Sequence, residues 1–179
     1  MRKPNKVASI RRPKKPEMQP QVSIVPAKPN VMVGDEFTVD VVARNFSQAT
    51  TSATIGISFD HHALRLISFA LTDRSPFDFI VANDPLYGVL GPVTLLAPLH
   101  DTNPIGDFRA LTLRFKATAT GKANLNVFED DFDGWLGADL ARIPVEYLNT
   151  SVRVAVSPLP AALHFMVSGL TGRRSKRFN

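Results

Sequence analysis

The sequence predicts an all-β protein, an antiparallel β-sandwich or jelly roll of roughly eight or nine strands. Three observations support this. Short apolar segments, most of them alternating with polar residues, recur at intervals near ten residues along the chain. No segment has the apolar spacing of an amphipathic helix of three turns. The 14 prolines fall mostly between these segments or at their ends, where they do not interrupt a strand ladder.

The length of 179 residues predicts one folded domain with two tails. Residues 1–20 combine Arg, Lys and Pro with few apolar residues, so we expect this segment to be disordered. The sandwich is expected over residues 21–156, and residues 157–179 form a tail with a basic end. The chain has no cysteine, which excludes a disulfide framework and a thiolate metal site.

The net charge of +5 comes from the tails and not from the predicted sandwich. All 16 acidic residues but only ten of the 21 basic ones lie between positions 17 and 172, so this body is net acidic by six. We therefore expect no nucleic-acid binding by the folded domain, because phosphate backbones are bound by clustered cations. Any affinity for polyanions would belong to the tails.

The basic N-terminal segment is not followed by the apolar run of a secretory signal. Val7, Ala8 and Ile10 are too few, and Arg11 and Arg12 interrupt them. Either the protein is not exported by this route, or the start was assigned wrongly and the true signal lies upstream or has been lost. We expect the second, for a reason that comes from the other end of the chain.

The clearest strand pattern lies between Asp107 and Phe128. One apolar row alternates with polar residues and consists of Leu111, Leu113, Phe115, Ala117 and Ala119. After Gly121 the alternation resumes with Ala123, Leu125 and Val127. The short Thr-Gly-Lys connection between the two rows predicts a β-hairpin.

The remaining strands are expected at 22–25, 37–44, 55–59, 64–71, 77–81, 93–97 and 151–156. Residues 45–52 are expected to form a polar loop, and Asp60, His61 and His62 a turn. The alternation predicts one core between two sheets. Its members are Phe37, Val39, Val41, Ile55, Ile57, Phe59, Leu111, Leu113, Phe115, Leu125 and Val127.

Several of these segments together resemble the cohesin domain. They are Val-Ser-Ile-Val-Pro from residue 22, Val-Gly-Asp-Glu-Phe-Thr-Val-Asp-Val from residue 33, the Phe-Asp-His-His-Ala-Leu turn from residue 59, and Leu-Thr-Leu-Arg-Phe-Lys with its downstream Gly121. The resemblance covers residues 22 to 156. It implies the nine-stranded jelly roll that cohesins share with family 2 and 3 carbohydrate-binding modules, and a noncatalytic binding role.

The end of the chain resembles a PEP-CTERM sorting tail of the VPLPA type. The similarity lies in Pro158, Leu159 and Pro160, the apolar run 161–170, and the basic cluster that starts with Arg173 and Arg174. It implies an extracellular or cell-envelope protein of a Gram-negative bacterium. The apolar run has about half of the ~20 residues that span a bilayer, so we expect at most transient membrane contact through the basic end.

Catalytic motifs are missing from the sequence, so we expect no enzyme activity. The four histidines have no partners at metal or triad spacing, and His61 and His62 are interpreted as an exposed turn pair. Glu129, Asp131 and Asp133 precede Gly134 at the alternating spacing of a calcium loop, but the closing acidic position falls on Leu140. We favour a solvated acidic turn and expect no cofactor, with an irregular calcium site as the alternative.

Tyr87 and Trp135 are the weak candidates for ligand binding, since exposed aromatic rings can stack on sugars. Burial of Trp135, the single tryptophan, is the favoured alternative. Two functional hypotheses remain. The first is an extracellular module that binds a protein partner or a polysaccharide; the second is a structural protein of an exopolysaccharide matrix, in which the sandwich is a spacer and the tail directs sorting.

Overall fold

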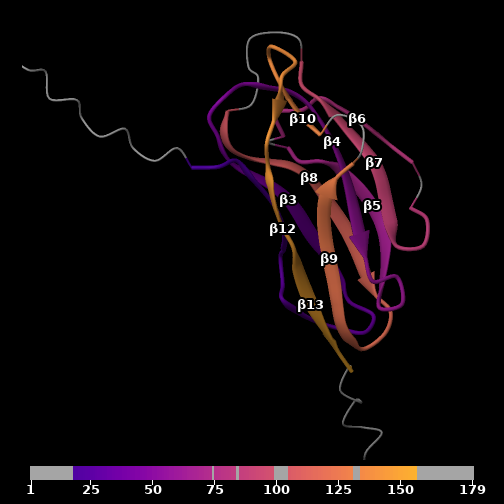
Figure 1. Cartoon of the computed structure of the whole chain (residues 1–179). Helices are drawn as coiled ribbons and strands as arrows, with labels where there is room; N and C mark the ends of the chain where they lie inside the picture. Colours follow the sequence, from indigo (N-terminus) through magenta and orange to yellow (C-terminus); the bar gives the residue numbers. More distant parts are fainter. Residues whose placement is uncertain (1–17, 74, 84, 99–104, 131–133, 157–179) are drawn as a thin grey trace, which may run out of the picture.

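The protein is described by a computed structural model over residues 18–73, 75–83, 85–98, 105–130 and 134–156. These residues form two β-sheets packed face to face, with no helix among them (Figure 1). This confirms the predicted all-β sandwich. The strands number 13 in the described part of the chain, because several short edge strands join the expected ones.

The first sheet has the strand order β12-β1-β3-β8-β5 and is called the β3–β8 sheet. Its strands are β1 Gln21–Pro26, β3 Glu36–Phe46, β5 Leu64–Leu71, β8 Gly106–Ala117 and β12 Glu146–Leu148. The two longest, β3 and β8, lie at its centre and pair antiparallel, with Phe37 opposite Phe115. The strand β5 forms one edge of this sheet.

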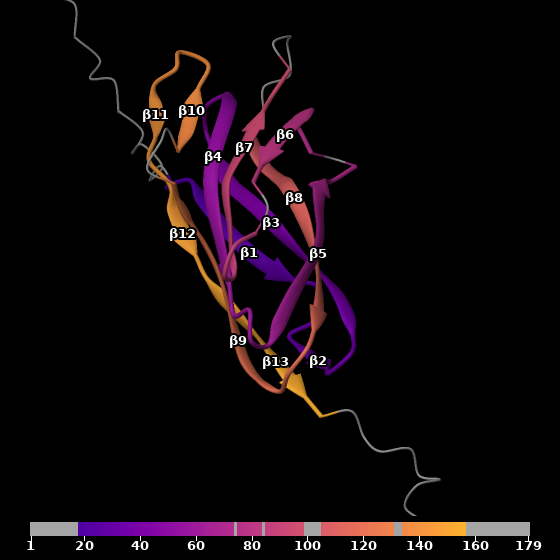
Figure 2. The ribbon, with the colours of Figure 1, turned by 90° about the vertical axis from the view of Figure 1, so that its right-hand side faces the viewer.

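The second sheet, called the β4–β9 sheet, has the order β11-β10-β4-β9-β13-β2, with β7 beside β4 and β6 beside β7. Its strands are β2 Asn30–Met32, β4 Thr50–Phe59, β6 Phe79–Ala82, β7 Val89–Leu96, β9 Gly121–Glu129, β10 Trp135–Gly137, β11 Arg142–Ile143 and β13 Thr150–Ala155. Figure 2 shows β6, β10 and β11 at the upper end of the sandwich and β2 with the end of β13 at the lower end.

The core lies between the two sheets, where the alternation placed it. All of the predicted core residues are at most 9% exposed, which confirms that prediction. Phe115 is at the centre of an aromatic contact between the sheets: its ring centroid lies 6.0 Å from that of Phe37 and 5.1 Å from that of Phe59. The Asp60 to His62 turn is also confirmed, since the Asp60 carbonyl accepts the Leu64 amide at 2.8 Å.

The predicted hairpin between β8 and β9 is wrong. The two strands lie in different sheets, so the chain crosses from one layer of the sandwich to the other between Ala117 and Gly121. Gly121 has φ 139°, a backbone conformation that favours glycine, and Ala119 is exposed instead of continuing the apolar row. A period of two places a strand's apolar side on the core from either sheet, so the alternation could not distinguish a hairpin from a crossing.

Two further expectations need correction. The polar loop expected at 45–52 is shorter, because β3 continues to Phe46 and β4 begins at Thr50. The sandwich is not wholly antiparallel, since β1 pairs parallel with β12 and β2 pairs parallel with β13. Strands of two or three residues, such as β2 and β11, are too short to show a period, which explains why the sequence did not predict them.

Candidate protein-docking face

The outer face of the β3–β8 sheet carries paired charges. Arg109 lies 3.2 Å from Asp40, which also accepts a hydrogen bond of 2.6 Å from the Thr112 hydroxyl. On the same two strands Arg114 donates to Glu36 at 2.5 Å. Exposed pairs of this kind contribute little to stability. Arg65 and Lys116, which are opposite one another on β5 and β8, form no ion pair with a described residue.

The outer face of the β4–β9 sheet differs, because its β6 and β7 strands expose apolar side chains. Phe79 is opposite Leu96, and Val81 is opposite Thr94, in the antiparallel pairing of these strands. Phe79 is 53% exposed and Val81 51% exposed. On the next strand Thr54 lies opposite Thr94, and their hydroxyl oxygens are 3.4 Å apart. This stretch of the face is therefore apolar or hydroxylated, and the nearby charge is the Asp130 carboxylate, 3.7 Å from where a Cβ atom on Gly91 would lie.

The apolar surface continues across β4 onto β9 at Gly56 and Phe128. These residues are opposite one another in the strand pairing, and a Cβ atom on Gly56 would lie 2.2 Å from the Phe128 ring. The glycine thus allows the aromatic ring to lie against the backbone of β4, with 38% of Phe128 exposed. We call the outward surface of Phe79, Val81, Thr94, Leu96, Gly56 and Phe128 the docking face.

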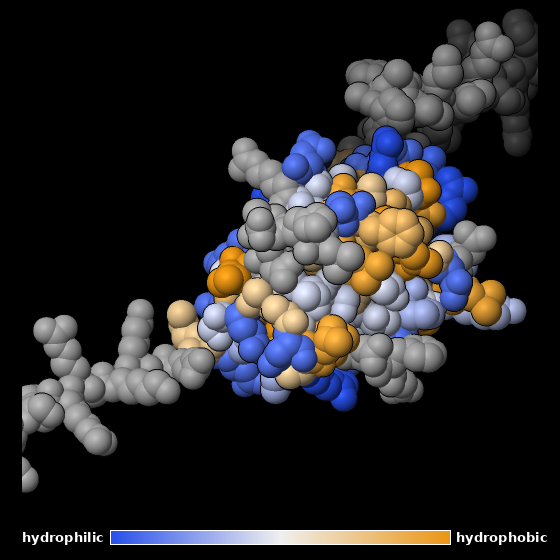
Figure 3. Space-filling model, turned by 90° about the horizontal axis from the view of Figure 1, so that it is seen from above, coloured by the Kyte–Doolittle hydropathy of each residue, from blue (hydrophilic) through white to orange (hydrophobic). Residues whose placement is uncertain are grey.

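A hollow of about 480 Å³ adjoins the upper end of the docking face. It shares Leu96 with that face and is also lined by Pro98 and Leu140. Leu140 is 72% exposed and has φ 62°, an uncommon conformation for leucine. Figure 3 looks down on this end of the sandwich, where hydrophobic side chains form orange groups between polar ones.

The second hollow with an apolar floor lies at the lower end, beside Tyr87. It measures about 380 Å³ and is lined in part by His61, Arg65 and Tyr87. Tyr87 is 81% exposed, so the structure leaves this sequence candidate available to a ligand. His61 and His62 are exposed, with ring centroids 4.1 Å apart, as the turn prediction expected.

Trp135 is fully buried, at 0% exposure, and cannot stack on a ligand. Its ring contacts Phe46 at a centroid distance of 4.9 Å and Phe77 and Phe108 at 6.1 Å each. Trp135 pairs with Ala53 near the start of β4, whereas Tyr87 lies close to Phe59 at its end, about 20 Å away along the strand. The two candidate aromatic residues therefore do not form one site, and the favoured alternative, burial of Trp135, is confirmed.

Trp135 adjoins Tyr147, a tyrosine whose phenol has a raised pKa. The Trp135 indole N–H and the Tyr147 hydroxyl are buried without a hydrogen-bond partner among the described residues. Burial, and secondly the carboxylate of Glu129, raise the pKa of Tyr147 well above its ordinary value, while Trp135 and Arg142 oppose the rise. A buried, neutral phenol beside the Trp135 indole is assigned to the core, and Tyr147 is not among the residues that line the hollows beside Leu96, Tyr87 and Thr72.

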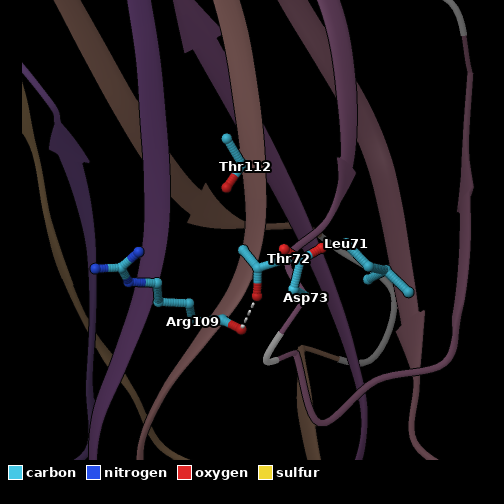
Figure 4. A pocket seen from close by; sticks show the side chains of 5 residues that line it. All are labelled: Leu71, Thr72, Asp73, Arg109 and Thr112. Atoms are coloured by element: carbon cyan, nitrogen blue, oxygen red, sulfur yellow. Dashed lines mark hydrogen bonds between the residues drawn. The ribbon is translucent and has the colours of Figure 1, made fainter.

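A more polar hollow, of about 370 Å³, lies on the β3–β8 sheet (Figure 4). The Thr72 hydroxyl donates to the Arg109 carbonyl at 3.3 Å, while the Arg109 side chain extends away from Thr72 and Asp73. The Arg109 guanidinium pairs with Asp40 instead. The titratable groups at this hollow do not converge on one point, so it lacks the geometry of a general acid and base pair.

Other sequence candidates fall partly or wholly outside the described residues. The sorting-motif residues Pro158, Leu159, Pro160, Arg173 and Arg174 lie outside them, as do Asp131 and Asp133 of the acidic loop. In the part of the chain that the structure describes, no three His, Cys, Asp or Glu side chains gather as metal ligands would. Within the same part there is no helix of the length and hydrophobicity needed to cross a membrane.

The sequence pattern does not reveal the docking face. Phe77, Phe79 and Ile80 belong to one apolar run, and the structure buries Phe77 but exposes Phe79. Such a run has apolar residues on both faces, so its pattern does not reveal which of them is left uncovered. The one available signal was the apolar residue in place of an expected polar one at Phe79, Val81 and Leu96.

Neither a protein-family model nor a curated protein matches this sequence. Solved structures do match it. The seventh ScaB type I cohesin of Pseudobacteroides cellulosolvens is 22% identical, with a TM-score of 0.63 over 78% of this chain and 95% of that one. A non-cellulosomal cohesin of the archaeon Archaeoglobus fulgidus is 12% identical, with a TM-score of 0.64 over 83% and 98%.

A third match is the OlpA cohesin of Clostridium thermocellum, solved as a type I cohesin–dockerin complex. It is 14% identical, with a TM-score of 0.61 over 75% of this chain and 99% of that chain. The sandwich therefore has the cohesin fold, as the sequence resemblance implied. At identities this low the likeness concerns the fold, and the function has to be argued from the surface.

Proposed function

We propose that this protein is a noncatalytic binding module that holds a protein partner on its docking face. The observation that carries the proposal is the contrast between the two outer sheet faces. The central strands β3 and β8 present charged side chains on one face, among them Asp40, Arg109 and Arg114, whereas the other face exposes Phe79, Val81 and Phe128, with the Asp130 carboxylate near Gly56 and Gly91. An apolar surface of this kind in a soluble domain is typical of an interaction site.

The chemistry of the docking face indicates what the partner presents. Apolar side chains would cover Phe79 and Val81, and a hydrogen-bonding group would reach the Thr94 hydroxyl, since Thr54 behind it is buried at 7% exposure. Large apolar side chains near the centre of an interface supply most of its binding free energy, so Phe79 and Phe128 are the expected anchors. The hollow beside Leu96 and Leu140 extends this surface at its upper end.

Two lines of support come from the comparisons and the sequence. The OlpA cohesin was solved with a dockerin, which is a protein partner. The same cohesin likeness, and the resemblance of residues 156–177 to a sorting tail, support an extracellular setting. We accordingly propose export, a partner outside the cytoplasm, and no catalytic activity.

A photoreactive phenylalanine derivative placed at Val81 of the full chain tests the docking face. We expect one discrete adduct when the protein is irradiated among the extracellular proteins of the cells that produce it. The matched control carries the same group at Thr38, an exposed residue on the outer face of β3. Phe79→Asp should abolish the Val81 adduct, because a charge at this position repels an apolar partner surface. No adduct, or equal adducts from both positions, would refute the proposal.

A further inference from the structure

The hollow beside Tyr87 is separate from the docking face and has the features of a ligand site. Its floor is formed by Phe59, Leu64 and Leu66, and Arg65, His61 and Tyr87 stand around it. The volume of about 380 Å³ lies within the range of small-molecule sites, which is roughly 300–1,000 Å³. We call it the Tyr87 pocket.

Tyr87 stands in a turn that does not favour tyrosine. Leu86 and Val89 exchange two backbone hydrogen bonds of 2.9 Å, and the residues between them, Tyr87 and Gly88, have φ 48° and 80°. This is a type I′ turn, whose first central position favours asparagine because a positive φ crowds a larger side chain. A strained backbone at an exposed aromatic residue points to a use for the ring.

The turn is also held firmly in place. A Cβ atom on Gly88 would lie 2.4 Å from the Phe59 carbonyl oxygen and 3.2 Å from the His61 side chain. The backbone of the turn therefore lies directly against the Asp60 to Ala63 turn, and it positions Tyr87, which forms one wall of the pocket. A backbone that is already ordered lowers the entropic cost of binding a ligand beside it.

The charge around the Tyr87 pocket is opposite in sign to the net charge of the domain. No carboxylate is among the described residues that line it, although residues 17–172 are net acidic. Arg65 is exposed and forms no ion pair with any described residue, and its direct neighbour across the strands is Lys116. Glu36 on the next strand is opposite Lys116 but bonds to Arg114. Like charges directly opposite one another destabilise a sheet, and an anion beside Arg65 would relieve this repulsion.

We propose that the Tyr87 pocket binds an acidic pyranose, a hexuronate residue of an anionic polysaccharide. The C–H face of the sugar ring stacks on the Tyr87 phenol, and its carboxylate pairs with the guanidinium of Arg65, whose planar fork matches a carboxylate. Hydroxyl groups of the sugar reach His61 and Thr118 at the rim. An acidic peptide side chain would use Arg65 but leave the tyrosine ring and the apolar floor uncovered.

The test is a titration of the isotopically labelled full chain with trigalacturonate, followed by NMR, with cellotriose as the neutral probe of equal length. We expect trigalacturonate to shift the resonances of Tyr87, Gly88 and Arg65, and cellotriose to bind about tenfold more weakly because it lacks the charge-assisted contact. The basic tails attract any anion, so the changes are scored only at the pocket. Equal binding of both probes, or no shift at the pocket, would overturn the proposal.

Two substitutions locate the site without disturbing the fold. Tyr87→Asn places the preferred residue in the type I′ turn, so the variant should be at least as stable as the wild type and still lose about tenfold in affinity. Leu86→Ala, at a 66% exposed neighbour outside the pocket lining, should leave the affinity unchanged. If Tyr87→Asn binds as the wild type does, the ring plays no part and the proposal fails.

Arg65→Ala should weaken trigalacturonate binding about tenfold and flatten its salt dependence, whereas Arg153→Ala on β13 should do neither. A peptide of aspartates that binds the pocket as tightly as trigalacturonate would instead identify an acidic protein partner and overturn the sugar assignment. Val81→Asp, which disrupts the docking face, should leave sugar binding intact. The two proposals can therefore fail independently.

Discussion

Phe115 shows how a single residue connects the two sheets. It is fully buried on β8, pairs with Phe37 in its own sheet and meets Phe59 of the opposite sheet edge-on. Because the side chain fills the space between both layers, its removal leaves a cavity that the surrounding strands cannot close.

Phe115→Ala should therefore lower the free energy of unfolding by ~3–5 kcal/mol. Urea denaturation followed by tryptophan fluorescence measures this, since Trp135 is buried in the same core. Phe79→Ala, at an exposed phenylalanine, is the control and should change stability by less than ~1 kcal/mol. Similar losses in both variants would show that Phe115 is not the central contact.

Tyr147 should make the stability of the protein depend on pH in the alkaline range. Its pKa is raised chiefly by burial, so the folded protein keeps the phenol neutral at a pH where the unfolded chain, with a pKa of about 10, has lost the proton. The stabilisation is complete below about pH 10 and is lost as the pH rises toward the folded pKa, by up to ~1.4 kcal/mol per pH unit.

Tyr147→Phe removes this titration and should give a flatter decline in stability between about pH 8 and pH 11. At pH 8 we expect the variant to match the wild type within ~1 kcal/mol, because the deleted hydroxyl is buried without a partner among the described residues. Urea midpoints at both pH values measure the effect. Parallel declines in the two proteins would show that Tyr147 titrates normally.

At the scale of elements, the contact between the turn before β7 and the end of β4 depends on one glycine. Gly88 has φ 80° and no room for a Cβ atom, whereas Gly34 has φ 97° and open space around it. Both positions strain an alanine by ~1–2 kcal/mol, but only Gly88 adds a collision with the Phe59 backbone.

Gly88→Ala should therefore cost ~1–3 kcal/mol more than Gly34→Ala, the additional cost being that of moving the backbone apart. Thermal unfolding of the two variants beside the wild type measures the difference. Equal costs would mean that the turn does not lie against β4 as described. Gly88→Ala should also displace the Tyr87 wall and so weaken sugar binding, which Gly34→Ala should not do.

At the scale of the whole molecule, the C-terminal tail combines a short apolar run with basic residues, and this predicts that it binds anionic membranes without spanning them. The apolar run 161–170 would form a helix of only ~15 Å, about half of the ~30 Å hydrocarbon core. His164 within it adds a further cost of insertion. The basic residues that follow, among them Arg173 and Arg174, each contribute ~1 kcal/mol near an anionic surface.

Residues 156–179 fused to a soluble reporter should accordingly bind anionic vesicles weakly and be released by a high-salt wash, because salt screens the charges. Co-sedimentation before and after the wash measures this, and neutral vesicles are the control. Retention through high salt or alkaline carbonate would indicate that the segment inserts and that the sorting signal is intact.

The sequence by itself determined the fold class and the core. Alternation of side chains follows from the geometry of a single strand, so Val39, Ile57 and Leu113 reveal their burial without any knowledge of the neighbouring strand. The same local reasoning identified the exposed His61 and His62 turn and favoured burial of Trp135.

Only the tertiary structure decided which strands are neighbours, because pairing depends on the packing of segments far apart in the chain. It assigned β8 and β9 to different sheets, separated Trp135 from Tyr87, and left the Phe79 side of β6 uncovered. It also brought Arg65 beside Lys116, which are 51 positions apart in the sequence. A period of two indicates which side of a strand is apolar, but it does not indicate which strand or sheet will cover that side. Both proposed sites depend on which sides are left uncovered.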